Sequence, residues 1–217
     1  MDKLKVPVIF LEWGFDPNLS KEDKQFYQKA AAKGIVGIAY AFPALDKNTF
    51  DGTMEDIDDR PDCVIIPIEL NDEKMERTHS GIARIALYGD DRDDHPMITL
   101  TEDCYQAIKD KASSEFCIYH ELGHYFCGHL TSENTEGYRK ARTDAIKNHT
   151  VFWQEEMADA FATHYVSGDL IAAELDDRNA YFSALHYSSA IDEDDFQMMT
   201  SEYTYRSSAV RAYCGLN

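Results

Sequence analysis

The spacing of apolar and polar residues changes character partway along the chain. In the first hundred residues, short apolar runs are separated by charged or turn-rich segments, a pattern typical of β-strands. These runs predict strands at 6–11, 35–42, 63–70, 82–89 and 97–102, with a charged loop at 71–80. One helix is predicted among them at 20–33, where Ser20 is a suitable N-cap and Gly34 ends the pattern.

After Asp103 the apolar residues recur with helical spacing. The pattern predicts helices at 103–130, interrupted near Ser113, and at 152–166, 169–176 and 179–190. The tail 200–213 has no pattern that assigns it to a helix or a strand. A few strands followed by mostly helices indicate an α+β fold. We expect a single domain over 1–217, with an N-terminal α/β portion at 1–95 whose role is open and a core at 96–217.

The charge narrows the range of partners. The 217 residues include 40 acidic and 21 basic side chains, which gives a net charge of -19. Such a chain repels phosphate backbones and anionic lipid headgroups, so we expect no nucleic-acid partner and no membrane association. The five cysteines are irregularly spaced and no signal peptide is evident, which favours free thiols and a cytoplasmic location.

The candidate chemistry lies in the stretch 118-IYHELGHYFCGHL-130. On a helix, His120 and His124 project from the same face one turn apart, so their imidazoles can bind one metal ion. Glu121 lies about 100° around the helix from His120, where it can act on a water molecule at that ion. This is the arrangement of the H-E-x-x-H motif, in which two histidines bind zinc and the glutamate is a general base.

The residues around this motif are apolar, so the helix is expected to be buried. Buried histidine and glutamate side chains are costly unless something compensates them, and a metal ion would do so. The alternative is a pair of hydrogen-bonded histidines in the core. Gly123, inside the motif, would allow another segment to approach closely.

A catalytic zinc site needs a third protein ligand, for which the sequence offers three candidates. His129 does not have the spacing of a metzincin ligand, and His149 lies in a polar segment without a supporting pattern. Glu155 is four residues before Asp159 on a predicted alanine-rich helix, so the two carboxyl groups share one face. We therefore favour Glu155 as the ligand, with Asp159 hydrogen-bonded to a ligand imidazole.

The segments 120-HELGHYFCGH-129 and 155-EEMADAFA-162 together resemble the gluzincin zinc metallopeptidases, most closely the ImmA/IrrE type and more distantly the minimal gluzincins. The resemblance covers roughly residues 97–168. It implies a zincin-like core, in which a small mixed sheet with an edge strand lies over the H-E-x-x-H helix and a second helix bears a ligand. His120, His124 and Glu155 would bind Zn²⁺, Glu121 would be the general base, and Asp159 would support a ligand histidine. The strand 97–102 would be the edge strand that holds the substrate.

These expectations lead to one function and one alternative. The first is a zinc-dependent metallopeptidase that hydrolyses a protein or peptide substrate through a zinc-activated water, with Glu121 as general base. The alternative is a catalytically silent zinc-binding module that regulates or binds another protein. A fourth protein ligand to the zinc, such as Cys127 or His129, would favour this alternative. Residues that could stabilise an oxyanion are not ranked by the sequence and include His164, Tyr165, Tyr181, His186 and Tyr187.

Overall fold

A computed structural model describes two compact units, residues 1–106 and 107–217. Within them, the described residues are 8–11, 21–41, 64–77, 83–88, 95–111, 113–130, 140–141, 144–145, 147–148, 151–188 and 190–216. The predicted α+β class is confirmed, because the first unit contains a sheet and the second is helical in its described part. The predicted N-cap Ser20 and the candidate ligand His149 lie outside the described residues.

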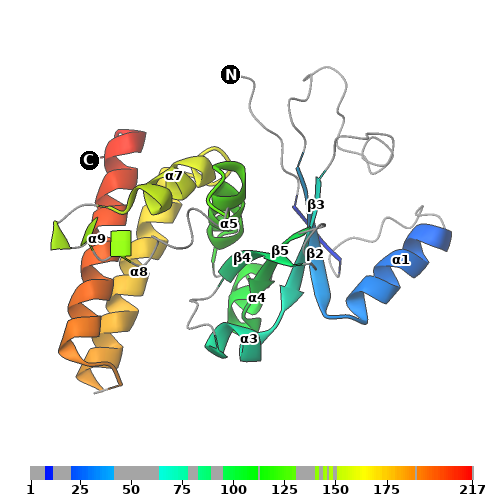
Figure 1. Ribbon diagram of the computed structural model, residues 1–217, viewed down its shortest axis with the longest axis horizontal. Helices are drawn as coiled ribbons and strands as arrows, with labels where there is room; N and C mark the ends of the chain where they lie inside the picture. The colour runs from blue at the N-terminus through cyan, green and yellow to red at the C-terminus, as the bar shows by residue number, and fades with distance from the viewer. Residues whose placement is uncertain are drawn as a thin grey trace. The chain divides into compact units, whose positions relative to one another are not determined.

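The first unit is built on a five-stranded mixed sheet with the strand order β1-β2-β3-β5-β4 (Figure 1). The strands are β1 (Val8–Phe10), β2 (Ile35–Ala41), β3 (Val64–Leu70), β4 (Ala83–Tyr88) and β5 (His95–Leu100). Only β3 and β5 pair in parallel, and the other neighbours are antiparallel. The centre of the sheet is apolar and fully buried, with Ile66 and Ile68 on β3 and Ile98 and Leu100 on β5. Burial of these side chains away from water stabilises the strands that the apolar runs predicted.

The prediction that residues 97–102 form an edge strand is wrong, because the strand at this position lies inside the sheet. The strand there is β5, which pairs with β3 through Ile68–Leu70 on one side and with β4 along its whole length on the other. Both of its hydrogen-bonding edges are occupied, so an extended peptide cannot add to it. The apolar alternation of 97–102 indicated a strand correctly, but alternation does not reveal a strand's position in the sheet.

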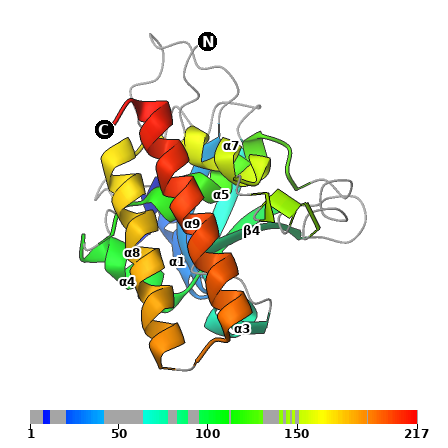
Figure 2. The ribbon, with the colours of Figure 1, turned by 90° about the vertical axis from the view of Figure 1, so that its left-hand side faces the viewer.

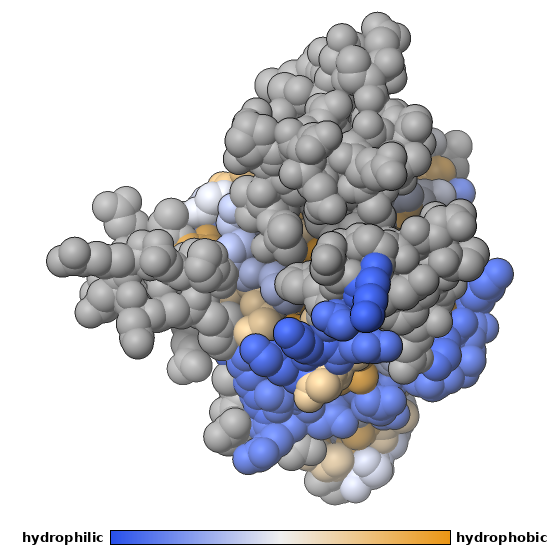
Figure 3. All heavy atoms as spheres, turned by 90° about the vertical axis from the view of Figure 1, so that its right-hand side faces the viewer, coloured by the Kyte–Doolittle hydropathy of each residue, from blue (hydrophilic) through white to orange (hydrophobic). Residues whose placement is uncertain are grey.

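The described helices of the first unit are α1 (Lys21–Ala31), α3 (Asp72–Arg77) and α4 (Glu102–Lys109), which continues into the second unit. The segment 71–80, predicted to be a loop, contains α3. Asn71 Oδ1 accepts a hydrogen bond from the Lys74 amide and Met75 is buried, which together explain the short helix. Figure 3 shows a face on which the coloured residues are mainly hydrophilic, in keeping with the charged composition.

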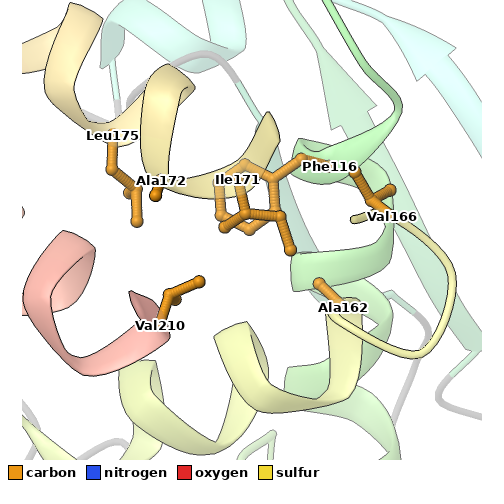
Figure 4. Packing of buried hydrophobic residues seen from close by; sticks show 7 residues of the cluster. All are labelled: Phe116, Ala162, Val166, Ile171, Ala172, Leu175 and Val210. Carbon is orange, nitrogen blue, oxygen red and sulfur yellow. The ribbon is translucent and has the colours of Figure 1, made fainter. Parts of the chain in front are cut away.

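The main helices of the second unit are α5 (Phe116–Phe126), α7 (Trp153–Ala162), α8 (Gly168–Tyr187) and α9 (Glu193–Cys214). The helices α8 and α9 lie side by side and run antiparallel, while α7 lies between α5 and α9 (Figures 1 and 2). The apolar core joins all four helices. Figure 4 shows its residues, which are Phe116, Ala162, Val166, Ile171, Ala172, Leu175 and Val210.

The C-terminal helices differ from the sequence prediction. The two helices expected at 169–176 and 179–190 are the single helix α8, and the unassigned segment 200–213 belongs to α9. The break predicted near Ser113 is present, because α4 ends at Lys109 and α5 begins at Phe116. No helix in the described part of the chain combines the length and apolar character needed to cross a membrane.

Candidate metal site

The helix α5 is held on its buried side by apolar residues. Ile118 and Leu122 are fully buried, and Phe116 belongs to the core of the second unit. At the start of the helix, the Phe116 amide donates a hydrogen bond to Ser114 Oγ, and the Ser114 amide donates to Glu174 Oε1 of α8. The helix is therefore fixed at its first turn as well as by its packing, which sets the direction in which His120 projects.

A glycine brings α5 and α7 unusually close together. A Cβ atom added at Gly123 would lie 2.8 Å from Ala158 Cα and 2.9 Å from the Ala158 carbonyl oxygen. Such distances are too short for any side chain, so only glycine allows this approach. The close approach predicted for Gly123 is thus present, and it places the carboxyl groups of α7 against the histidines of α5.

The contact between the two helices gathers His120, His124 and Glu155. One donor atom from each lies within 4.8 Å of the others. The two Nε2 atoms are 3.1 Å apart, and Glu155 places Oε2 3.3 Å from His120 Nε2 and Oε1 3.7 Å from His124 Nε2. All three residues are buried, with exposed fractions of 7%, 8% and 4%. This buried group could hold a metal ion, and its members are the three residues predicted as ligands.

Asp159 and Arg206 surround the other side of the His120 ring. Asp159 Oδ1 lies 2.8 Å from His120 Nδ1, which leaves Nε2 directed at Glu155. Arg206 of α9 donates to both oxygens of Asp159, at 2.8 Å and 2.7 Å, and its Nη1 lies 3.1 Å from Glu155 Oε2. Arg206 is 5% exposed and was not among the site residues predicted from the sequence. The buried guanidinium of Arg206 compensates part of the negative charge of the two buried carboxylates.

These neighbours shift the pKa values of the buried groups. Burial and Arg206 lower the pKa of His120, but the carboxylates of Asp159 and Glu155 outweigh them and raise it to about 9. Burial and the adjacent His120 lower the pKa of His124 to about 3. Burial would raise the pKa of both carboxyl groups, yet Arg206 and His120 hold both below their ordinary values, Glu155 well below. The carboxylates remain ionised at neutral pH, as metal ligands and their supports must be.

His129 is also part of this site, although not among the three donors. It is 4% exposed, and its Nδ1 lies 2.9 Å from His124 Nδ1. Its ring meets the ring of Trp153 edge to face, with centroids 5.2 Å apart. Burial lowers the pKa of His129.

No family model, curated protein or solved structure matches this chain. A function can therefore be inferred only from the residues of the site and their geometry.

Glu121 follows His120 directly in α5 and is half-buried. The four described cysteines, Cys104, Cys117, Cys127 and Cys214, form no disulfide among the described residues, as expected from their spacing. Among the residues that the structure describes, the group that could hold a metal ion includes no cysteine.

The candidates for oxyanion stabilisation have contacts of other kinds. Tyr165 stacks on Tyr119 with ring centroids 4.5 Å apart, and burial raises its pKa to about 12. His186 stacks on Phe196, and its Nε2 lies 3.2 Å from Glu193. His164, Tyr181 and Tyr187 are exposed.

Proposed function

We propose that the protein is a zinc-dependent metallopeptidase of the gluzincin type, similar to the ImmA/IrrE metallopeptidases, with His120, His124 and Glu155 as zinc ligands. The observation that carries the proposal is the buried group of these three donors with Glu121 next to His120 in α5. Two imidazoles and one carboxylate are a donor set that suits zinc. The contact from Asp159 to His120 Nδ1 further favours a metal, because it leaves the Nε2 lone pair for coordination.

The number of donors favours catalysis over a structural role. Structural zinc sites in proteins usually have four protein ligands, whereas catalytic sites have three and keep one position for water or substrate. Within the described residues the group has three members, and His129 has its Nδ1 turned to His124 Nδ1 rather than to the donor atoms. This supports the peptidase over the silent zinc-binding module.

The proposed roles of the individual residues follow from the chemistry of their side chains. Zinc bound here would supply a Lewis acid that acidifies water and polarises a carbonyl. Glu121 would accept a proton from the attacking water and deliver it to the leaving amine, since a carboxylate one residue from a ligand is the general base of this motif. Asp159 and Arg206 would keep the His120 ring in one orientation throughout.

The proposed activity is tested with a peptide library rich in lysine and arginine, because the net charge of -19 favours basic substrates. Zinc-loaded protein should generate new peptide termini, detected by mass spectrometry. A metal chelator should abolish them, and Glu121→Gln should reduce their rate by at least about 100-fold while keeping its zinc. Cleavage that persists at the wild-type rate in zinc-loaded Glu121→Gln would contradict this mechanism.

A further inference from the structure

The end of α5 places His129 against His124 through the backbone itself. The His129 amide donates to the His124 carbonyl at 2.9 Å, and the Gly128 amide donates to the Tyr125 carbonyl at 3.1 Å. Gly128 has a φ of +75°, in the left-handed region. This pair of bonds is a Schellman cap, which brings the second residue after the C-cap Cys127 next to the residue five positions earlier.

The His124–His129 contact has a definite hydrogen-bond direction. Two ring nitrogens 2.9 Å apart need one donor and one acceptor. His124 Nε2 faces the donor group, 3.1 Å from His120 Nε2, and it must be unprotonated to bind a metal. The single proton of His124 is therefore on Nδ1 and is donated to His129 Nδ1. His129 in turn carries its own proton on Nε2.

We propose that His129 is a positioning residue for zinc binding, which fixes the ring orientation and the tautomer of His124 by accepting its Nδ1 proton. This inference rests on the proposed zinc site and deepens it. Its physical basis is that a ligand histidine almost always donates its other ring N–H to a hydrogen-bond partner, which fixes the tautomer and the ring orientation. Losing such a partner typically costs 10- to 100-fold in metal affinity. His120 has a carboxylate for this purpose, whereas His124 has a neutral imidazole.

The surroundings of His129 suit an acceptor that does not move. The side chain is buried, its backbone is held by the helix cap, and the Trp153 ring lies against it. Its Nε2 is buried without a hydrogen-bond partner among the described residues. His129 therefore contacts its hydrogen-bond partner through Nδ1, and that partner is His124.

The test compares His129→Leu, which removes the acceptor at similar volume, with His129→Asn, whose Oδ1 can accept from His124 Nδ1–H. Zinc affinity is measured by competition with a chromophoric chelator. We expect a loss of about 10- to 100-fold for His129→Leu and a loss of less than about threefold for His129→Asn. The exposed His164→Leu is the matched control and should bind zinc like the wild type. Urea unfolding of the metal-stripped variants shows whether a loss of affinity merely reflects a damaged fold.

A second measurement needs no variant. In zinc-loaded wild-type protein, the ¹⁵N chemical shifts of the histidine rings should show His129 protonated on Nε2 and unprotonated on Nδ1. Wild-type affinity in His129→Leu, an equal loss in His129→Asn, or a proton on His129 Nδ1 would each overturn the positioning role. Wild-type protein that binds no zinc would instead overturn the proposed function and this inference with it. The two failures are therefore distinguishable.

Discussion

Arg206 places a permanent positive charge against two buried carboxylates. Its side chain is 6% exposed and it contacts both Asp159 and Glu155. Removing one partner of a buried ion pair leaves an uncompensated charge, so Arg206→Met should lower the unfolding free energy of the metal-stripped protein by about 3–5 kcal/mol. Urea unfolding at neutral pH measures this change.

Arg211 provides the control, because it lies on the same helix and pairs with Asp176 at 2.7 Å, but at the surface. Arg211→Met should cost less than about 1 kcal/mol. Saturating zinc should reduce the loss of unfolding free energy caused by Arg206→Met, since a bound dication also compensates the negative charge of Glu155. Equal destabilisation by the two substitutions would contradict the role given to Arg206.

The raised pKa of His120 makes the stability of the metal-stripped protein depend on pH. The pKa rises from an ordinary 6.5 to about 9, so the proton stabilises the fold fully below pH 6.5. This contribution should decline between pH 6.5 and 9 by about 1 kcal/mol per pH unit and be absent above pH 9. Urea unfolding in a chelator across this range measures it. His120→Gln should lack this decline, and a decline of the same size in that variant would assign it to another group.

How far the sequence reveals the site depends on how far apart its residues lie. His120, Glu121 and His124 could be identified because one helix turn fixes their geometry, and Glu155 because it shares a helix face with Asp159. Arg206 comes 47 positions after Asp159, and no local pattern relates the two. For His129 a signal did exist: Gly128 after the helix indicates a cap that folds the next residue back.

At the scale of elements, the site depends on the distance between α5 and α7. Gly123→Ala would place a methyl group against the backbone of Ala158, which cannot yield without moving the helix. We expect a loss of about 1–3 kcal/mol in unfolding free energy, together with weaker zinc binding because Glu155 moves away from the histidines. Chemical unfolding and zinc competition measure the two effects.

The double variant Gly123→Ala/Ala158→Gly shows whether the added methyl group clashes with the backbone or with the side chain of Ala158. Since the nearest atoms are Ala158 Cα and its carbonyl oxygen, removing the Ala158 methyl group should not restore stability. Full recovery in the double variant would contradict the backbone contact and assign the clash to the Ala158 methyl group. A Gly123→Ala protein that equals the wild type in both measurements would contradict the close approach of the two helices.

The elements that the sequence did not reveal share a physical cause. The buried residues of α9 include Glu202, Arg206 and Ser207, so its buried face does not read as apolar. In α8 both halves were predicted as helices, and the charged residues Asp177 and Arg178 between them hid the continuity of the helix. Apolar periodicity predicts a helix only where the buried face is apolar.

At the scale of the whole molecule, the candidate site and the sheet belong to different parts of the chain. His120, His124, Glu155, Asp159 and Arg206 all lie in the unit of residues 107–217. The five-stranded sheet lies in the unit of residues 1–106. Metal binding can therefore be attributed to a few side chains of one unit and tested in the full chain by single substitutions.

The central claim is that His120, His124 and Glu155 bind one zinc ion, and the most direct measurement is the zinc content of purified, zinc-loaded protein. The wild type and Glu121→Gln should each retain about one zinc per chain, while Glu155→Ala should lose it. Glu156→Ala, which removes the exposed neighbouring carboxylate, is the control and should retain zinc. Wild-type protein that cannot be loaded with zinc, or Glu155→Ala that binds it with undiminished affinity, would contradict the site.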